Sequence, residues 1–243
     1  MMNDTAWLSR SELLLGREKL ERLFGAHVLV VGMGGVGSFA AEFICRSGVG
    51  SMTLVDGDVV EASNRNRQLP ALVSTQGQNK AVLMAARLKD INPEIELNVI
   101  QEFIRPEAVA NILSTKFDYV VDAIDSVSPK LTFIKAAFEK QYPLVSSMGA
   151  GGKMDPTKIE IADISKSYNC PFAQQVRKQL KKEGIYKGFK VVFSPEENNK
   201  ESLMMTDGSN FKKSAYGTMS YLPAMFGATA ASVVIRDLTN SNS

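Results

Sequence analysis

Five charged side chains between positions 56 and 125 have the types and spacing that phosphate and metal chemistry requires. They lie close behind apolar segments or at the start of a helical one, and they are Asp56, Asp58, Arg67, Lys80 and Asp125. Arginine and lysine neutralise phosphate charge, and Mg²⁺ in nucleotide sites is held by a carboxylate together with phosphate oxygens. Because a dinucleotide cofactor is bound mostly through backbone N–H groups, the added charges predict a triphosphate with a divalent metal.

A glycine-rich turn precedes these charges. The apolar run at 27–31 opens into four glycines, which are Gly32, Gly34, Gly35 and Gly37. A strand, a tight turn and a helix in this order let phosphate oxygens approach backbone N–H groups. Asp56 ends the next strand, where an acid accepts hydrogen bonds from ribose hydroxyls. A turn that only packs a helix on a sheet is the alternative, and it leaves Asp56 unexplained.

Each charged residue also has an ordinary structural explanation. Arg67 and Lys80 could be solvated surface charges, and Asp125 could cap the helix that follows it. These explanations are weaker for the three residues together, because all three fall at the carboxyl ends of predicted strands. Ligands of open α/β sheets bind at that edge.

The elements that position these residues alternate between apolar strands and helices, which predicts an α/β fold with a Rossmann-like, doubly wound, mostly parallel sheet. Strands are expected at 27–31, 51–56, 95–100, 117–123 and 143–148, and helices at 35–46, 78–89 and from about 106 and 129. The alternation loosens after residue 155, which predicts a C-terminal α+β extension with strands at 158–164 and 190–194 and a basic helix at 172–182.

The length of 243 residues suits a single nucleotide-binding unit over 1–243, with a core at about 10–155 and a substrate-side extension at about 156–243. The segment 195–217 carries few apolar residues and is expected to be a mobile loop near the site or a plain surface excursion. A formal net charge of +2 argues neither for nor against a nucleic-acid partner.

Cysteine usage and the chain ends indicate a cytoplasmic protein. Cys45 and Cys170 lie far apart, and residues 1–10 have no apolar core of a signal peptide. Cys45 falls within a helix and is expected to be buried, whereas Cys170 could be exposed. The apolar run 221–235 is short for a bilayer and predicts a buried helix, with no stable membrane span. The one histidine, His27, begins the first strand, so histidine-based catalysis is not expected.

Five motifs in this order resemble the ubiquitin-activating E1-like superfamily of adenylating enzymes (ThiF, MoeB and HesA type). They are GMGGVG at 32–37, LVDGD at 54–58, SNRNRQ at 63–68, the step at 77–80 and DAIDS at 122–126. Within the superfamily, three further features resemble the tRNA threonylcarbamoyladenosine dehydratases: SRSELLLG at 9–16, the form DAIDS-x-x-x-K, and GAGGKMDP at 149–156.

The resemblance implies roles for individual residues. The four glycines and Asp56 would hold the phosphates and the ribose of ATP, and the remaining nucleotide contacts would come from Asp58, Asn64, Arg67, Lys80 and Ser126. Asp125 would hold Mg²⁺. Arg10 would act in trans from the other subunit of a homodimer on the leaving pyrophosphate. The catalytic residues would thus be Arg10, Arg67, Lys80 and Asp125.

The resemblance also implies a reaction. A carboxylate oxygen of threonylcarbamoyladenosine, next to the anticodon of a tRNA, would attack the α-phosphorus of ATP, and the ureido oxygen would then close an oxazolone ring with loss of AMP. No enzyme nucleophile is required. Two isolated cysteines cannot form the paired Cys-x-x-Cys zinc site of many bacterial relatives, so zinc is not expected. A sulfur-relay or electron-transfer protein remains open as a partner.

Two alternatives remain open. The first is an adenylyltransferase acting on the C-terminal glycine of a ubiquitin-like sulfur carrier. The second is a nicotinamide dehydrogenase or a non-catalytic NAD-binding module, which needs neither Lys80 nor Asp125.

A basic stretch could meet a tRNA phosphate backbone. It runs over 177–182 with Lys187 and Lys190, carries Tyr186 and Phe189 among the charges, and is joined in the sequence by Lys212 and Lys213. A solvated helix face is the plain explanation, and an acidic carrier protein would be attracted to the same charges.

Overall fold

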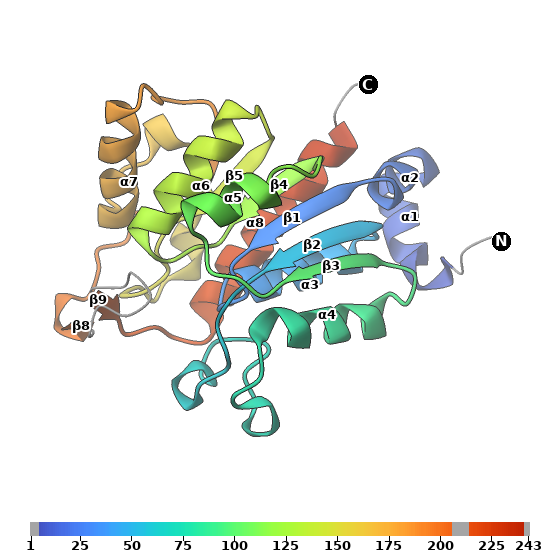
Figure 1. Ribbon diagram of the computed structural model, residues 1–243, viewed down its shortest axis with the longest axis horizontal. Helices are drawn as coiled ribbons and strands as arrows, with labels where there is room; N and C mark the ends of the chain where they lie inside the picture. Colours follow the sequence, from blue (N-terminus) through green and yellow to red (C-terminus); the bar gives the residue numbers. More distant parts are fainter. Residues whose placement is uncertain (1–4, 206–213, 241–243) are drawn as a thin grey trace.

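Seven strands form one sheet in the order β3-β2-β1-β4-β5-β7-β6 (Figure 1). The structure, a computed structural model, describes residues 5–205 and 214–240. The strands of this sheet are β1 (His27–Val31), β2 (Ser51–Val55), β3 (Glu96–Ile100), β4 (Tyr119–Asp122), β5 (Leu144–Ser147), β6 (Glu160–Asp163) and β7 (Lys190–Phe193). All neighbours pair in parallel except β6, which runs antiparallel to β7 at the edge. The predicted doubly wound, mostly parallel sheet is confirmed.

The central strands are buried on both faces, as their continuous apolar sequences predict. Every residue of β4 and β5 is buried, and so are four of the five residues of β1. The strand order reverses between β1 and β4, because the chain leaves β1 toward β2 and β3 and later returns to β4 on the other side. Loops that diverge at such a point leave a crevice for ligands.

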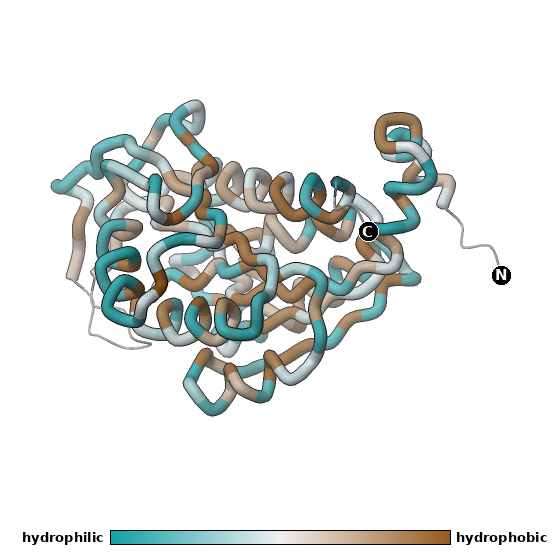
Figure 2. Tube along the Cα trace, turned by 90° about the horizontal axis from the view of Figure 1, so that it is seen from above, coloured by the Kyte–Doolittle hydropathy of each residue, from teal (hydrophilic) through white to brown (hydrophobic). Residues whose placement is uncertain are grey.

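Helices cover both faces of the sheet (Figure 1). They are α1 (Ser9–Leu15), α2 (Arg17–Phe24), α3 (Gly37–Arg46), α4 (Lys80–Ile91), α5 (Pro106–Ile112), α6 (Val127–Glu139), α7 (Pro171–Lys182) and α8 (Tyr221–Asn240). One apolar cluster joins the sheet to α3, α4 and α8, and a second joins the opposite face to α5, α6 and α7. In Figure 2 the apolar residues concentrate in the interior, and the N-terminal helices project at one end.

The C-terminal part of the chain belongs to the same layers. Strand β7 pairs with β5 within the main sheet, and α8 packs against α3. The apolar run at 221–235 is therefore a buried helix, as predicted, and none of the described helices is both long and apolar enough to cross a membrane.

The described residues of the segment 195–217 include regular structure that its composition did not predict. They form a 3-10 turn (Lys200–Ser202) and a two-stranded ribbon of β8 (Leu203–Met205) and β9 (Ser214–Tyr216). The expectation of a mobile loop near the site stays a prediction. The predicted contribution of Lys212 and Lys213 lies outside the described residues.

Gly227 allows α8 to approach the first loop of the sheet. A Cβ atom at this position would lie 2.5 Å from the Val36 carbonyl oxygen and 2.9 Å from Phe39 Cβ. Helix α8 therefore rests directly on the start of α3, which carries the glycine-rich turn.

We predict that Gly227→Ala lowers the free energy of unfolding by about 2 kcal/mol, because the added methyl overpacks this contact. Thermal unfolding should show a melting temperature about 5 °C lower. Gly25→Ala is the matched control, since Gly25 has φ −81° and its Cβ would meet nothing closer than 3.7 Å. Equal stability of the two variants would contradict the close packing of α8.

Candidate functional site

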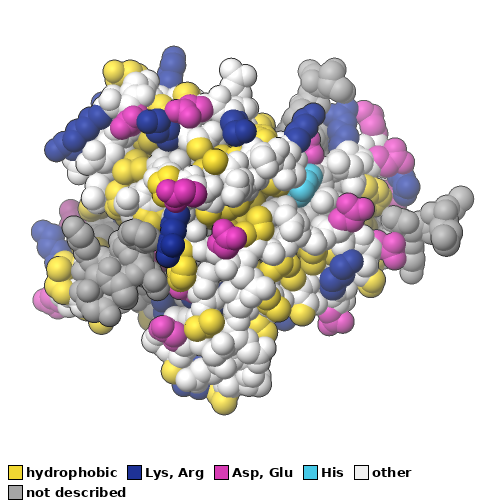
Figure 3. Space-filling model, viewed as in Figure 1, with side chains coloured by type: hydrophobic (Ala, Val, Ile, Leu, Met, Phe, Trp, Pro, Cys, Tyr) yellow, Lys and Arg dark blue, Asp and Glu magenta, His cyan; other side chains and the backbone are white. Residues whose placement is uncertain are grey.

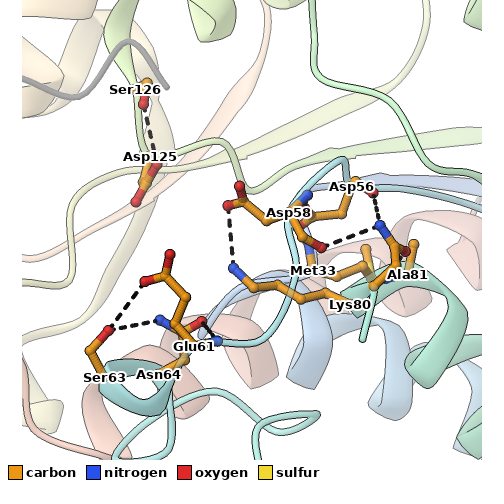
Figure 4. Close-up of polar contacts among 11 residues, drawn as sticks. Met33, Asp56, Asp58, Glu61, Ser63, Asn64, Lys80, Ala81, Asp125 and Ser126 are labelled. Carbon is orange, nitrogen blue, oxygen red and sulfur yellow. Dashed lines mark hydrogen bonds and ion pairs between the residues drawn. The ribbon is translucent and has the colours of Figure 1, made fainter. Parts of the chain in front are cut away.

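The predicted site residues other than Arg10 gather where β1, β2 and β4 end. The glycine-rich turn follows β1, Asp56 and Asp58 follow β2, and Asp125 follows β4. These strands are neighbours in the sheet, with β1 between the other two. The side chains drawn in Figure 4 come from these segments, from α4 and from the turn at Ala62–Asn64.

The glycine-rich turn is closed by backbone contacts that exclude side chains. Gly32 has φ +92°, and a Cβ there would lie 2.9 Å from the Ala123 carbonyl oxygen. A Cβ at Gly37 would lie 1.7 Å from the Gly32 carbonyl oxygen, so the helix start meets the strand end backbone to backbone. The N-terminus of α3 therefore faces the crevice, which is the arrangement that binds phosphate groups.

The Asp56 carboxylate is held by the backbone of this turn. It accepts hydrogen bonds from the Met33 N–H at 2.6 Å and from the Asp58 N–H at 2.7 Å. Burial raises the pKa of the Asp56 carboxyl, while the Lys80 cation and the two N–H donors act in the opposite direction. An acid fixed in this way at the end of the second strand is placed for ribose hydroxyls.

Lys80 begins α4 and turns its ammonium group back toward the ends of the strands. Its Nζ lies 3.2 Å from Asp58 Oδ2, and its side chain is 6% exposed. Asn79 sets this geometry, since its side chain caps α4 through the Ala81 and Val82 N–H groups and donates to the carbonyls of Asp56 and Asp58. Asn79 was not among the predicted site residues, although an asparagine before a helical segment is a recognisable capping signal.

The polar stretch after β2 folds as a short turn that buries Asn64. Asn64 Oδ1 accepts from the Glu61 N–H at 3.1 Å, so the amide shapes the turn that carries it. The Arg67 guanidinium donates to the Ser63 carbonyl and to Asn66 Oδ1, both at 2.9 Å. Burial lowers the pKa of Arg67, and the nearby Asp125 opposes that shift.

Two further residues join this stretch to the site. Asn66 donates to the Thr218 carbonyl at 2.9 Å, which links the stretch to the approach of α8. Gln68 Oε1 is buried and has no hydrogen-bond partner among the described residues, and the same side chain borders Gly34. A buried acceptor beside the glycine turn is suited to a ligand hydroxyl or a water. No sequence pattern distinguishes this glutamine from its polar neighbours.

Asp125 is exposed in the loop between β4 and α6, and Ser126 occupies the N-cap position of α6 without a side-chain capping hydrogen bond. The explanation of Asp125 as the N-cap residue is therefore wrong. Ser126 Oγ donates to Asp125 Oδ1 at 3.3 Å. No group of three or more His, Cys, Asp or Glu side chains suited to a metal occurs among residues 5–205 and 214–240. One carboxylate completed by phosphate oxygens is nevertheless a normal donor set for Mg²⁺, so the residues present fit this ion.

Arg10 does not join the site of its own chain. It is exposed on α1, beside the amino-terminal ends of the strands, whereas the other predicted residues lie at the carboxyl ends (Figure 1). Leu13 and Leu14 on the same helix are 84% and 85% exposed.

A hollow of about 460 Å³ opens beside Asp56. It is bounded by Gly57, by the chain between β3 and α5, and by the start of α5, and its lining includes Gln101, Phe103 and Arg105. A Cβ at Gly57 would lie 2.7 Å from the Phe103 backbone nitrogen, so the floor of the hollow is held against the strand carrying Asp56.

The cysteines and the histidine lie away from reactive positions. Burial raises the pKa of the Cys45 thiol to about 12, which keeps it protonated near neutral pH. Cys170, for which the sequence left exposure open, is only 4% exposed. His27 begins β1, at the opposite edge of the sheet from the site, and its ring contacts Thr53 Oγ1.

Comparison with known proteins places these features in a family. The ThiF family model matches residues 8–243. This chain belongs to the ThiF family. The tRNA threonylcarbamoyladenosine dehydratase of Bacillus subtilis is 44% identical over 95% of this chain and 93% of its own length, and that of Escherichia coli is 37% identical over 96% and 94%.

Solved structures give the same grouping for this ThiF family member. The Escherichia coli dehydratase TcdA in complex with ATP superposes with a TM-score of 0.89 at 36% identity, over 98% of this chain and 96% of that one. The Escherichia coli sulfur carrier protein ThiS adenylyltransferase is a more distant relative, 29% identical over 63% of each chain.

We predict that acidification weakens nucleotide binding through Asp56. The folded pKa of this acid lies above its unfolded value, so its protonation favours folding as the pH falls and costs no stability. The lost charge should raise the dissociation constant of ATP by about tenfold, equivalent to about 1.4 kcal/mol.

Calorimetric titration with ATP between pH 7.5 and pH 5, with melting temperatures in parallel, measures this effect. Asp56→Asn is the control, because it keeps the titration of ATP itself and removes that of the carboxyl. The same pH slope in the variant and the parent protein would contradict the prediction.

Proposed function

We propose that this protein is an ATP-dependent tRNA threonylcarbamoyladenosine dehydratase, which converts threonylcarbamoyladenosine in tRNA to its cyclic oxazolone form. The observation that carries the proposal is the match along nearly the whole chain to dehydratases, including TcdA in its ATP complex. The glycine turn, Lys80 and Asp125 at one switch point supply the groups that this chemistry requires.

The first step activates a poor electrophile. A carboxylate oxygen of the substrate attacks the α-phosphorus of ATP, and the bond to the β-phosphate oxygen breaks to release pyrophosphate. The N-terminus of α3 and the cations Lys80 and Arg67 hold and neutralise the phosphates while Asp56 holds the ribose, so catalysis is mainly positioning and charge stabilisation. The nucleobase would occupy the hollow beside Gly57 and Phe103.

Asp125 would hold a Mg²⁺ ion at this site. When bound, the ion supplies positive charge to the phosphate oxygens of the nucleotide. Arg67 lies near enough to influence Asp125 electrostatically, so the two residues present opposite charges to the same region. Asp58, which already pairs with Lys80, orients that lysine.

The second step needs no nucleophile from the enzyme. The ureido oxygen of the substrate attacks the activated carbonyl carbon, AMP leaves with the former carboxylate oxygen, and a proton leaves the ureido nitrogen. Burial of both cysteines agrees with such a mechanism, since a thioester would require an accessible thiolate.

Helix α7 and the loop after it would contact part of the tRNA. Lys178, Lys181, Lys182 and Lys187 are exposed there, beside the exposed ring of Tyr186. The basic patch has fewer members in the structure than the sequence predicted. Arg177 is hydrogen-bonded to Ser167, Lys190 is paired with Asp237, and Phe189 is buried. Figure 3 shows basic side chains mixed with acidic ones over α6 and α7, so the surface is suited to moderate attraction only.

A homodimer would complete each site. Arg10 is remote from the site of its own chain, and it shares α1 with the exposed apolar side chains of Leu13 and Leu14. Apolar side chains this exposed are typical of a surface covered by a partner. The dimer would bring Arg10 of one subunit to the pyrophosphate in the other.

The test of the activity uses purified protein, ATP, Mg²⁺ and tRNA that carries threonylcarbamoyladenosine. Mass spectrometry of the digested tRNA should show a nucleoside lighter by one water molecule, with one AMP and one pyrophosphate released per cyclisation. Pyrophosphate exchange stimulated by a carrier ending in Gly-Gly, with none stimulated by the modified tRNA, would instead identify an adenylyltransferase.

We predict that Arg10→Ala and Asp125→Ala each lower the rate by at least about 100-fold, because each removes charge that stabilises the transition state. If Arg10 acts in trans, mixing the two inactive variants should restore up to about a quarter of the activity, since one of the two sites in a mixed dimer is intact. Arg17→Ala, an exposed arginine on α2, is the control for Arg10. Mixed dimers without activity would contradict the shared site.

A further inference from the structure

An ion pair of two fully buried side chains lies directly behind the loop that carries Asp125. Lys130 Nζ lies 2.7 Å from Asp122 Oδ2, and both side chains are 0% exposed. Asp122 ends β4, and Lys130 lies near the start of α6, so the two residues bracket the loop 123–126. Burial of two charges costs desolvation energy that their attraction does no more than balance, so such a pair is a poor source of stability.

The Asp122 carboxylate also fixes the loop and the neighbouring strand. Its Oδ1 accepts from the Ile124 N–H at 3.0 Å, and its Oδ2 accepts from Ser146 Oγ on β5 at 2.6 Å. The Ala123 N–H in turn donates to the Val31 carbonyl at 2.9 Å, at the start of the glycine turn. One carboxylate therefore connects the end of β4, the loop, the helix after it and β5.

The Lys130 ammonium has its own fixed surroundings. It lies 5.8 Å from the centre of the Phe172 ring on α7, and Phe172 Cβ would lie 3.6 Å from a Cβ on Gly149. The lysine is thus enclosed by β4, α6 and the start of α7. Its ion pair with Asp122 connects α6 to the end of β4, where the loop begins.

We propose that Asp122 and Lys130 are positioning residues, whose ion pair fixes the loop 123–126 so that the Asp125 carboxylate meets the metal and the nucleotide phosphates. The inference deepens the proposed function, because it depends on the assignment of Asp125 to Mg²⁺. A buried apolar pair of similar volume would stabilise the fold equally well. It would not set the direction of a loop, because apolar contact is not directional.

The double variant Asp122→Asn, Lys130→Met separates positioning from stability. It removes both charges, keeps an acceptor for the Ile124 N–H and leaves no buried charge unpaired. Lys135→Met is the matched control on α6, because Lys135 forms an exposed ion pair with Glu183. Calorimetry with ATP over a range of Mg²⁺ concentrations, and with ATP and EDTA, measures nucleotide and metal binding without any tRNA.

The double variant should fold and bind metal-free ATP as the parent protein does. The Mg²⁺ concentration that gives half of the maximal change in ATP binding should rise by at least about tenfold, which is the usual effect of losing an outer-shell contact to a metal site. The KM for modified tRNA should stay unchanged as kcat falls, and Lys135→Met should match the parent protein throughout.

An unchanged Mg²⁺ dependence in a folded double variant would overturn the inference, and so would equal losses of ATP affinity with and without Mg²⁺. If the double variant does not fold, the same measurement is made on Ser146→Ala, because this variant keeps both charges and removes one hydrogen bond to Asp122. A rise in the required Mg²⁺ of about threefold then supports positioning, and no rise overturns it. ATP binding that is insensitive to Mg²⁺ in the parent protein would contradict the metal assignment and the inference together, whereas absence of the cyclic product with normal Mg²⁺ dependence would contradict only the activity.

Discussion

The close approach of two backbone turns, one after β1 and one after β4, is the constraint on which the site depends. Gly32 lies against the Ala123 carbonyl, and Gly37 lies against Gly32 itself. With these contacts closed, the Met33 N–H points at Asp56, and the loop that carries Asp125 is aligned with the glycine turn. The glycine turn, Asp56 and Asp125, which are proposed to hold the phosphates, the ribose and Mg²⁺, thus share one small region of backbone, so a displacement of either turn would disturb all three.

Much of this arrangement could be predicted from the sequence because it depends on local pattern. Apolar runs that end in glycine or in an acid identify buried parallel strands and their carboxyl ends, and topology then brings Asp56, Lys80 and Asp125 to one edge. The same reasoning fails where a tertiary contact decides the outcome. Arg177 and Phe189 turn inward, and Cys170 is covered, because α7 packs on α6 and on the loop at Gly149. Asp122 and Lys130 are polar residues in the core, and only the packed structure shows that they pair.

A tRNA, the substrate of the proposed reaction, is large enough to contact both the nucleotide site and the distant lysines of α7. The start of α7 packs against Gly149, which follows β5 at the carboxyl ends of the strands, and the chain after α7 contacts Asp163 at the opposite ends. The 12 residues of α7 span about 18 Å, so the lysines near its end lie well away from the nucleotide. The modified adenosine next to the anticodon would enter the site while the phosphates of the same tRNA reach the lysines. A small metabolite could not make both contacts.

In the proposed homodimer, the position of α1 at the amino-terminal ends of the strands would make activity depend on the concentration of the protein. A lone subunit would present the glycine turn, Asp56 and Lys80 to ATP without the arginine that supports departure of pyrophosphate. Dilution below the dissociation constant of the dimer would then leave a protein that holds ATP and turns it over slowly. Self-association would thereby act as a safeguard against wasteful hydrolysis, with full activity confined to pairs of subunits.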